Sequence, residues 1–164
     1  MDKMEEFHIP KDALKKLKNT EYLRKELSEG KSLKEIIGYS ESVMEKFYAA
    51  AYRLFQMKEY TKSADAFLFL TTLDPYVYNF WLGLGMSEQL KEDYENALVA
   101  YSMAILLDAH NPLPHFHSAT CYQKTDNVQD TRASLELAIE YAGDQAEFME
   151  IKKKSQEILW RLNQ

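Results

Sequence analysis

The sequence predicts an all-α fold in which pairs of amphipathic helices stack side by side. Three observations support this. Similar residues recur every 34 residues over three copies, the chain has only 4 prolines and 5 glycines, and 46% of its residues are hydrophobic. So few prolines and glycines argue against a turn-rich β fold. The hydrophobic fraction is ordinary for one globular domain of 164 residues.

Charge and cysteine content narrow the class of protein. The net charge is -6, and an acidic chain lacks the basic footprint that nucleic-acid binding needs. Basic residues at 11–18 and 152–154 alternate with apolar or acidic ones, which is typical of solvated helix faces. Cys121 is the single cysteine, so no internal disulfide can form and a reducing compartment is indicated.

No segment of the sequence resembles a membrane or export signal. The first twelve residues are polar and acidic, without an apolar signal-peptide core. The longest apolar-rich run, residues 97–107, is too short for a bilayer span of about 20 residues. We therefore expect a cytoplasmic protein without stable membrane insertion.

Two helices are expected before the repeats, after a loosely tethered segment at residues 1–9. The first follows Pro10, which suits a first helical turn, and stops at Gly30. Its apolar residues recur at near-helical spacing: Ala13, Leu14, Leu17, Tyr22, Leu23 and Leu27.

The second N-terminal helix is short and has a clear start signal. Ser32 followed by Glu35 forms a capping box, and Gly38 ends the helix. Ser40 can cap the next helix, which opens the repeats.

The three copies are expected at residues 44–77, 78–111 and 112–145, after an N-terminal extension at 1–43. Their shared small residues let two helices approach closely: Ala51, Gly85 and Ala119 at the eighth position, and Ser63, Ala97 and Thr131 at the twentieth. Large residues between them fill the space: Phe47, Trp81 and His115, then Tyr60, Tyr94 and Val128, then Phe67, Tyr101 and Leu135. This spacing matches the tetratricopeptide pattern, so we expect three such repeats forming a concave solenoid.

The turn within each repeat departs from the pattern. Its usual glycine is replaced by Lys58, Glu92 and Asp126. These residues can still make a helical turn, at some cost if the backbone needs a positive φ.

Residues 146–164 predict a helix that caps the array, because the last repeat of a solenoid would otherwise expose an apolar face. Its apolar residues are Ala146, Phe148, Met149, Ile151, Ile158, Leu159 and Leu162. We expect Trp160 to pack where this helix meets the last repeat.

The first helix of the first repeat has more large apolar residues than one buried stripe requires. Tyr48, Tyr52 and Phe55 form a second face. In stacked repeats the first helices line the concave surface, at positions 2, 5, 9, 12 and 13. The residues at these positions are Glu45, Tyr48, Tyr52, Phe55 and Gln56, then Asn79, Leu82, Met86, Gln89 and Leu90, then Leu113, Phe116, Thr120, Gln123 and Lys124.

This predicted groove is apolar, with tyrosine hydroxyls and amides at intervals. Such a surface suits an extended peptide, whose apolar side chains fill pockets while its backbone is hydrogen-bonded. The alternative is that the N-terminal helices fold back over this face, which would make Tyr48 and Tyr52 ordinary core residues.

We expect no catalytic residues, metal site or cofactor. His110, His115, His117 and Cys121 are near one another in sequence, but only His117 and Cys121 have the i, i+4 spacing of a helical metal pair. A third ligand is missing locally, and packing of Cys121 between helices is the better interpretation. Residues 83–85 form only GxG inside a predicted helix, which indicates close helix packing.

Residues 32–160 closely resemble the class II chaperones of bacterial type III secretion, which look after pore-forming translocators. The motifs are residues 80–85 (FWLGLG), Tyr94-x-x-Ala97 and Phe116-His117-x-Ala119-x-Cys121. Gln89, Tyr101, Asp108 and Pro112 match as well, as does the first copy in order and spacing. The altered turns suggest a divergent member.

The resemblance implies a cytoplasmic, non-enzymatic chaperone that binds hydrophobic translocators before export and prevents premature association. It implies an extended client segment in the concave groove, and a homodimer formed through the N-terminal helices. The expected groove residues are Tyr48, Tyr52, Phe55, Asn79, Leu82, Met86, Gln89, Leu90, Phe116 and Thr120. The expected dimerisation residues are Leu14, Leu17, Tyr22, Leu23 and Leu27.

A generic tetratricopeptide adaptor, which scaffolds a complex or captures a C-terminal carboxylate, is the alternative function. Carboxylate capture needs converging basic and amide groups. The predicted groove offers Lys124 and Asn79 but no arginine, which weakens that version of the alternative.

Overall fold

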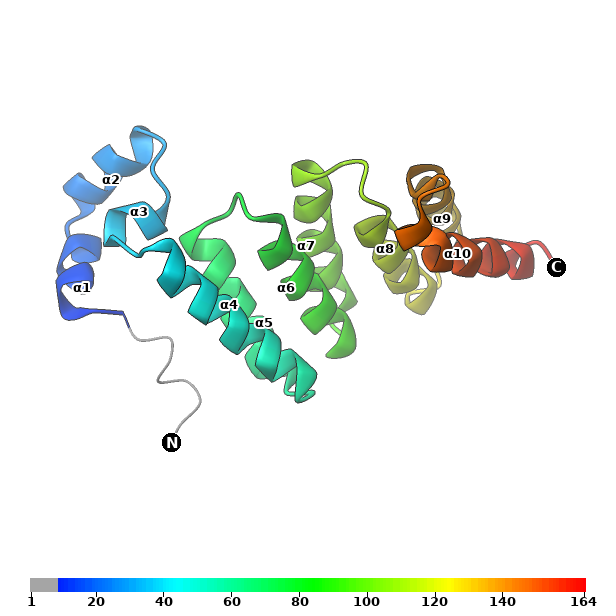
Figure 1. Cartoon of the computed structure of the whole chain (residues 1–164), viewed down its shortest axis with the longest axis horizontal. Helices are drawn as coiled ribbons and strands as arrows, with labels where there is room; N and C mark the ends of the chain where they lie inside the picture. The colour runs from blue at the N-terminus through cyan, green and yellow to red at the C-terminus, as the bar shows by residue number, and fades with distance from the viewer. Residues whose placement is uncertain (1–8) are drawn as a thin grey trace.

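The computed structural model describes residues 9–164, and the regular elements in that range are all helices (Figure 1). They are α1 (Lys11–Lys18), α2 (Thr20–Ser28), α3 (Leu33–Ile37), α4 (Glu41–Gln56), α5 (Tyr60–Leu73), α6 (Tyr78–Leu90), α7 (Tyr94–Leu107), α8 (Pro112–Lys124), α9 (Val128–Ala142), the 3-10 turn η2 (Ala146–Phe148) and α10 (Met149–Leu162). The expectation of a loosely tethered start falls on residues 1–8, which lie outside the described residues, and on Ile9. Within the described part, no helix is long and apolar enough to span a bilayer.

Helices α4 to α9 form three pairs that stack in chain order. Each helix contacts the next along the chain, from α4 through to α10. In Figure 1, α4, α6 and α8 lie nearer the viewer, and α5, α7 and α9 lie behind them. This confirms the predicted all-α repeat fold, with the first helices of the three repeats on one face.

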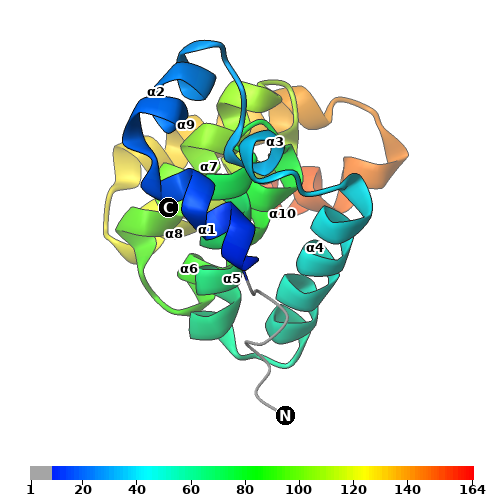
Figure 2. The ribbon, with the colours of Figure 1, turned by 90° about the vertical axis from the view of Figure 1, so that its left-hand side faces the viewer.

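Helices α1, α2 and α3 cover one end of this stack (Figure 2). The prediction of one continuous helix from Pro10 to Gly30 is wrong, because the chain breaks at Asn19, whose backbone is extended (φ -85°, ψ 92°). The side-chain oxygen of Asn19 accepts a hydrogen bond from the backbone N–H of Tyr22 at 3.0 Å, so it caps a new helix. Asparagine is a strong capping residue, and that signal outweighs the apolar periodicity that runs across it.

The other predicted helix starts are confirmed. The backbone N–H of Ser32 donates to Glu35 Oε2 at 2.7 Å, and Ser32 Oγ accepts from the Glu35 N–H at 3.3 Å, which completes the capping box. Ser40 Oγ accepts from the backbone N–H of Val43 at the start of α4. The short helix α3 therefore has fixed ends and can position the chain that leads into the repeats.

The pairs pack closely because glycine faces an aromatic ring at two points on α6. A Cβ atom at Gly85 would lie 2.5 Å from the ring of Tyr101, and one at Gly83 would overlap the ring of Phe67. Phe67 lies on α5 and Tyr101 on α7, so α6 is held tightly against both neighbours. The prediction that Gly83 and Gly85 serve close packing is confirmed.

The turn inside each repeat has a non-glycine residue with a positive φ, the geometry that the sequence analysis identified as costly. Lys58, Glu92 and Asp126 have positive φ values of 61°, 66° and 57°. A residue with a Cβ atom is disfavoured there by about 1 kcal/mol or more. The fold therefore tolerates strain at three equivalent places.

The end of the chain lies against the last repeat, and one expectation about it is wrong. Helix α10 contacts α9 and α8, and Ser155 is fully buried on its inner side. Trp160 is 65% exposed and does not pack against the last repeat. Five residues along a helix turn through about 140°, so Trp160 points away from the face that Ser155 buries.

Replacing Glu92 by glycine is expected to stabilise the protein by roughly 0.5–1 kcal/mol. Glycine adopts the positive φ without a steric penalty, which more than offsets its greater freedom in the unfolded chain. Urea unfolding monitored by circular dichroism measures the change. Glu136→Gly, in the exposed interior of α9, is the control and should destabilise by about 1 kcal/mol. Equal effects of the two substitutions would contradict the strained-turn account.

Candidate peptide-binding groove

A row of aromatic rings runs along the exposed side of α4. Tyr48, Tyr52 and Phe55 share one helix face because they are spaced at i, i+4 and i+7. The ring centroids of Tyr48 and Tyr52 are 6.4 Å apart, and those of Tyr52 and Phe55 are 6.5 Å apart, with nearly parallel planes in both pairs. Such stacking holds the three rings in one orientation, so they form a continuous aromatic surface on α4.

This row borders a hollow of about 120 Å³ between α4 and α6. Six of the ten predicted groove residues line it: Tyr48, Tyr52, Phe55, Asn79, Leu82 and Met86. An apolar cavity of about 150 Å³ accommodates a benzene-sized group, so this hollow suits one medium-sized apolar side chain. Fully burying such a side chain contributes about 1.5–3 kcal/mol.

Two further residues form part of the hollow, and the sequence reasoning placed neither in the groove. Phe67 and Gly83 line it together with the predicted residues. Phe67 lies on α5, the second helix of its repeat, and its ring meets the Tyr48 ring edge-on at a centroid distance of 6.0 Å. Its ring reaches the groove because Gly83 leaves space above it. The sequence feature that could have indicated this is Gly83 of α6, which lies opposite the large Phe67 of α5.

The four remaining predicted groove residues lie away from this hollow. Gln89 accepts a hydrogen bond from the Tyr101 hydroxyl at 2.6 Å, so its oxygen is engaged by the core. Leu90 is 47% exposed at the end of α6. Phe116 and Thr120 are half-buried on α8, where the Thr120 hydroxyl donates to the backbone oxygen of Phe116. A role for these four in binding stays a prediction.

The alternative in which the N-terminal helices cover the groove does not hold for Tyr52. This side chain is 48% exposed. Tyr48 is half-buried, and its ring lies 5.9 Å from that of Phe80, so it belongs partly to the core. Burial and the neighbouring Tyr52 raise the pKa of the Tyr48 hydroxyl, which therefore remains a protonated hydrogen-bond donor.

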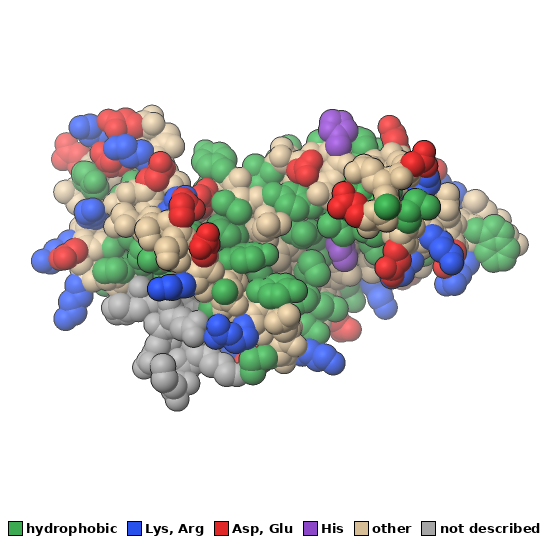
Figure 3. Space-filling model, viewed as in Figure 1, with side chains coloured by type: hydrophobic (Ala, Val, Ile, Leu, Met, Phe, Trp, Pro, Cys, Tyr) green, Lys and Arg blue, Asp and Glu red, His purple; other side chains and the backbone are tan. Residues whose placement is uncertain are grey.

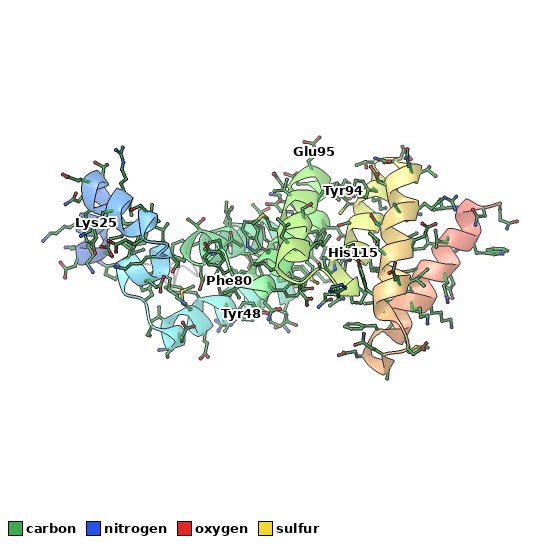
Figure 4. All side chains as sticks on the ribbon, turned by 90° about the horizontal axis from the view of Figure 1, so that it is seen from above. Lys25, Tyr48, Phe80, Tyr94, Glu95 and His115 are labelled. Carbon is green, nitrogen blue, oxygen red and sulfur yellow. The ribbon has the colours of Figure 1, made fainter. Side chains whose placement is uncertain are left out.

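A second hollow of about 200 Å³ continues the groove on the other side of Tyr48. Tyr48 and Asn79 line both hollows. The second is completed by Glu41, Met44, Glu45, Val77 and Phe80. Figure 4 shows Tyr48 and Phe80 close together on one side of the molecule. The groove between α4 and α6 thus has two depressions separated by one tyrosine.

Behind the groove, the aromatic and histidine side chains form packing contacts. His117 stacks on Tyr101 at a ring-centroid distance of 5.5 Å. Burial lowers the pKa of His117 to about 4 and raises that of Cys121 to about 12. Both groups are therefore neutral near pH 7. The buried position of Cys121 confirms the packing interpretation.

Among the described residues, no group of three or more His, Cys, Asp or Glu side chains is arranged to hold a metal ion. The carboxylates Glu92 and Glu95 at the turn before α7 are exposed, whereas Asp93 is half-buried and accepts a hydrogen bond from the backbone N–H of Asn96.

The predicted dimerisation residues lie at the far end from α10, on α1 and α2. Leu14 is 39% exposed and Leu27 is 47% exposed. Leu17, Tyr22 and Leu23 are half-buried. Two apolar side chains are thus open to solvent on this end, and their role in dimerisation stays a prediction.

An apolar groove on stacked helix pairs defines a peptide-binding protein of the tetratricopeptide type. Comparison with known proteins shows which family of this class the chain belongs to. No protein-family profile matches the chain. The low calcium response locus protein H of Yersinia pestis is 30% identical over 120 residues, which cover 73% of this chain and 71% of the relative. This degree of similarity identifies the family: the chain belongs to the class II translocator chaperones of type III secretion.

Solved structures of the same family share the fold. PcrH of Pseudomonas aeruginosa, in complex with the chaperone-binding region of PopD, is 27% identical, with a TM-score of 0.75 over 77% of this chain and 95% of the other. SycD of Yersinia enterocolitica, in complex with a peptide of the translocator YopD, is 28% identical, with a TM-score of 0.74 over 76% of this chain and 95% of the other. The sequence-based assignment to this family is confirmed.

Acidification is expected to destabilise the protein through His117. The folded-state pKa of about 4 lies below the ordinary value of 6.5, so the unfolded chain binds a proton first as the pH falls. The stability that the neutral ring contributes is complete above pH 6.5 and is lost progressively as the pH falls to about 4.

The comparison of the parent protein with His117→Phe measures this contribution. Between pH 7 and pH 4.5, the parent should lose about 2 kcal/mol more unfolding free energy than the variant. His110→Gln is the control for the loss of an exposed histidine. Parallel pH profiles for the parent and His117→Phe would show that His117 is not the sensitive group.

Proposed function

We propose that this protein is a cytoplasmic chaperone that binds the hydrophobic translocators of a type III secretion system before export. In this role it holds an extended client segment in the groove between α4 and α6 and prevents premature association. The observation that supports this most directly is the apolar hollow beside Tyr48, Tyr52 and Met86, in a chain whose relatives PcrH and SycD hold translocator segments.

The chemistry of the groove fits an extended peptide. One apolar side chain of the client enters the first hollow, and a second enters the hollow beyond Tyr48. Successive side chains of an extended chain point to opposite sides, so anchors come from alternate residues. The Tyr48 hydroxyl and the Asn79 amide between the two hollows can hydrogen-bond the client backbone.

A chaperone of this kind needs no catalytic group, and we propose that the protein is not an enzyme. Its relatives are chaperones. The alternative of carboxylate capture finds no support in the first hollow, because none of its described lining residues is basic.

We further propose that residues 1–43 form a dimerisation region, residues 44–145 the client-binding repeats and residues 146–164 the cap. The open leucines on α1 and α2 support the first assignment, because paired apolar side chains would be removed from water in a homodimer.

Tyr52→Glu is expected to abolish client binding. The new carboxylate would be buried beneath the bound segment without a partner, which costs several kcal/mol, or at least a hundredfold in Kd. Titration of the YopD peptide against the protein, followed by fluorescence anisotropy, measures the loss. Tyr76→Glu is the matched control, because Tyr76 is 71% exposed on the loop before α6 and lines neither hollow. A folded Tyr52→Glu protein with normal affinity would remove the groove assignment.

Leu14→Asp combined with Leu27→Asp is expected to weaken the homodimer by at least tenfold in Kd. Charged groups in place of two exposed apolar side chains would have to be desolvated at the interface. Sedimentation equilibrium measures the dissociation constant in the full-length protein. Leu106→Asp is the control, because Leu106 is 76% exposed on α7, away from this end. An unchanged dimer in the double variant would place the interface elsewhere.

A further inference from the structure

The two hollows of the groove differ in charge. The first is lined by aromatic and aliphatic side chains with one amide, Asn79. The second has two carboxylates, Glu41 and Glu45, both from the first turns of α4. Figure 3 shows acidic side chains gathered over the start of α4, beside apolar side chains that continue across the middle of the molecule. One end of the groove is therefore acidic.

The negative charge at this end is only partly compensated. Lys34 Nζ lies 2.7 Å from Glu41 Oε1 and 2.9 Å from Asp74 Oδ2. One ammonium group thus serves two carboxylates, and Glu45 has no ion-pair partner in residues 9–164. Asp74 does not line the second hollow, but together with Glu41, Glu45 and Lys34 it forms a cluster of three carboxylates and one ammonium group, with two net negative charges, at this end of the groove.

Neither basic side chain of α4 lines this hollow. Lys46 and Arg53 line a separate depression on another face of the helix, together with Val43, Phe47 and Ala49. The Glu41 side chain is 79% exposed, so its carboxylate lies at the rim of the groove rather than on its floor. The rim is thus open to a cation brought by a bound chain.

We propose that the client segment has a lysine or arginine directly beside the apolar side chain that enters the second hollow, and that Glu45 and Glu41 select it. This inference rests on the proposed function. In an extended peptide, the neighbour of an inward-pointing anchor points outward, at the level of the rim. A long basic side chain can lie along the groove wall while its charged head stays in water beside the carboxylates. A glutamate at the same place would be repelled.

Two charges at the start of α4 also give the groove a direction. The only basic residue among the predicted groove positions is Lys124, at the end of α8. A client with its basic residue at the second hollow therefore binds in one orientation and is disfavoured in the reverse one. Charge selects the register, and the apolar hollows supply most of the affinity.

The test uses the chaperone-binding region of PopD and the YopD peptide as probes. Each residue beside an apolar side chain is replaced in turn by Lys, Ala and Glu, and Kd is measured by fluorescence anisotropy. At one position, the Lys peptide should bind about two- to fivefold more tightly than the Ala peptide, as expected for an exposed ion pair. The Glu peptide should bind more weakly than both, and 0.5 M salt should narrow the differences.

Substitutions in the protein decide whether the rim carboxylates are responsible. In Glu45→Gln the ratio of Ala to Lys dissociation constants should fall toward one, and Glu41→Gln combined with Glu45→Gln should remove it. Glu95→Gln is the matched control and should keep the ratio, because Figure 4 shows Glu95 on the opposite side of the molecule from Tyr48. Circular dichroism confirms that each variant is folded.

Separate outcomes contradict the inference and the proposed function. If the peptides bind but no position prefers lysine, or if the preference survives in the double variant, the acidic rim does not select the client. If neither unsubstituted peptide binds the parent protein, the proposed function is contradicted and the inference falls with it.

Discussion

The close contact between Gly85 and the Tyr101 ring fixes the positions of α6, α7 and α8. Any larger residue would push α6 away from α7, because a Cβ atom there would lie 2.5 Å from the ring. The same ring stacks on His117 of α8, and its hydroxyl holds Gln89. One fully buried tyrosine thus ties the second repeat to the third and sets where α6 stands in the groove.

The shape of the groove also depends on close packing, through a second glycine of α6. Gly83 leaves room for Phe67, and Phe67 supports Tyr48 from behind. Tyr48 then divides the space between α4 and α6 into two hollows. The binding surface is therefore built on core contacts, and its aromatic residues are held in place before any client arrives. Such preorganisation reduces the entropy cost of binding.

The all-α fold and the pairing of its helices were predictable from the sequence, because a 34-residue period and small residues at fixed positions determine how helices pair. Positions on one face of α4 and one face of α6 also predicted six of the eight residues that line the first hollow. The break at Asn19 was missed because local capping competed with an apolar period that continued across it. Trp160 was misplaced because large apolar residues were assumed to pack, whereas helix geometry turns it outward. The place of Phe67 in the groove could not be read from helix periodicity, because its ring reaches the groove from α5 through the gap at Gly83.

If the client occupies the hollow between α4 and α6, it lies against Met86, whose methyl group can be observed directly. The protein has 7 methionines, so their methyl signals can be assigned with single Met→Leu variants and followed by NMR during titration with the YopD peptide. Met86 lines the hollow, whereas Met149 is 51% exposed on α10. We expect the Met86 signal to shift with saturation and the Met149 signal to stay in place. If the peptide binds and the Met86 signal does not move, the client segment does not occupy this hollow.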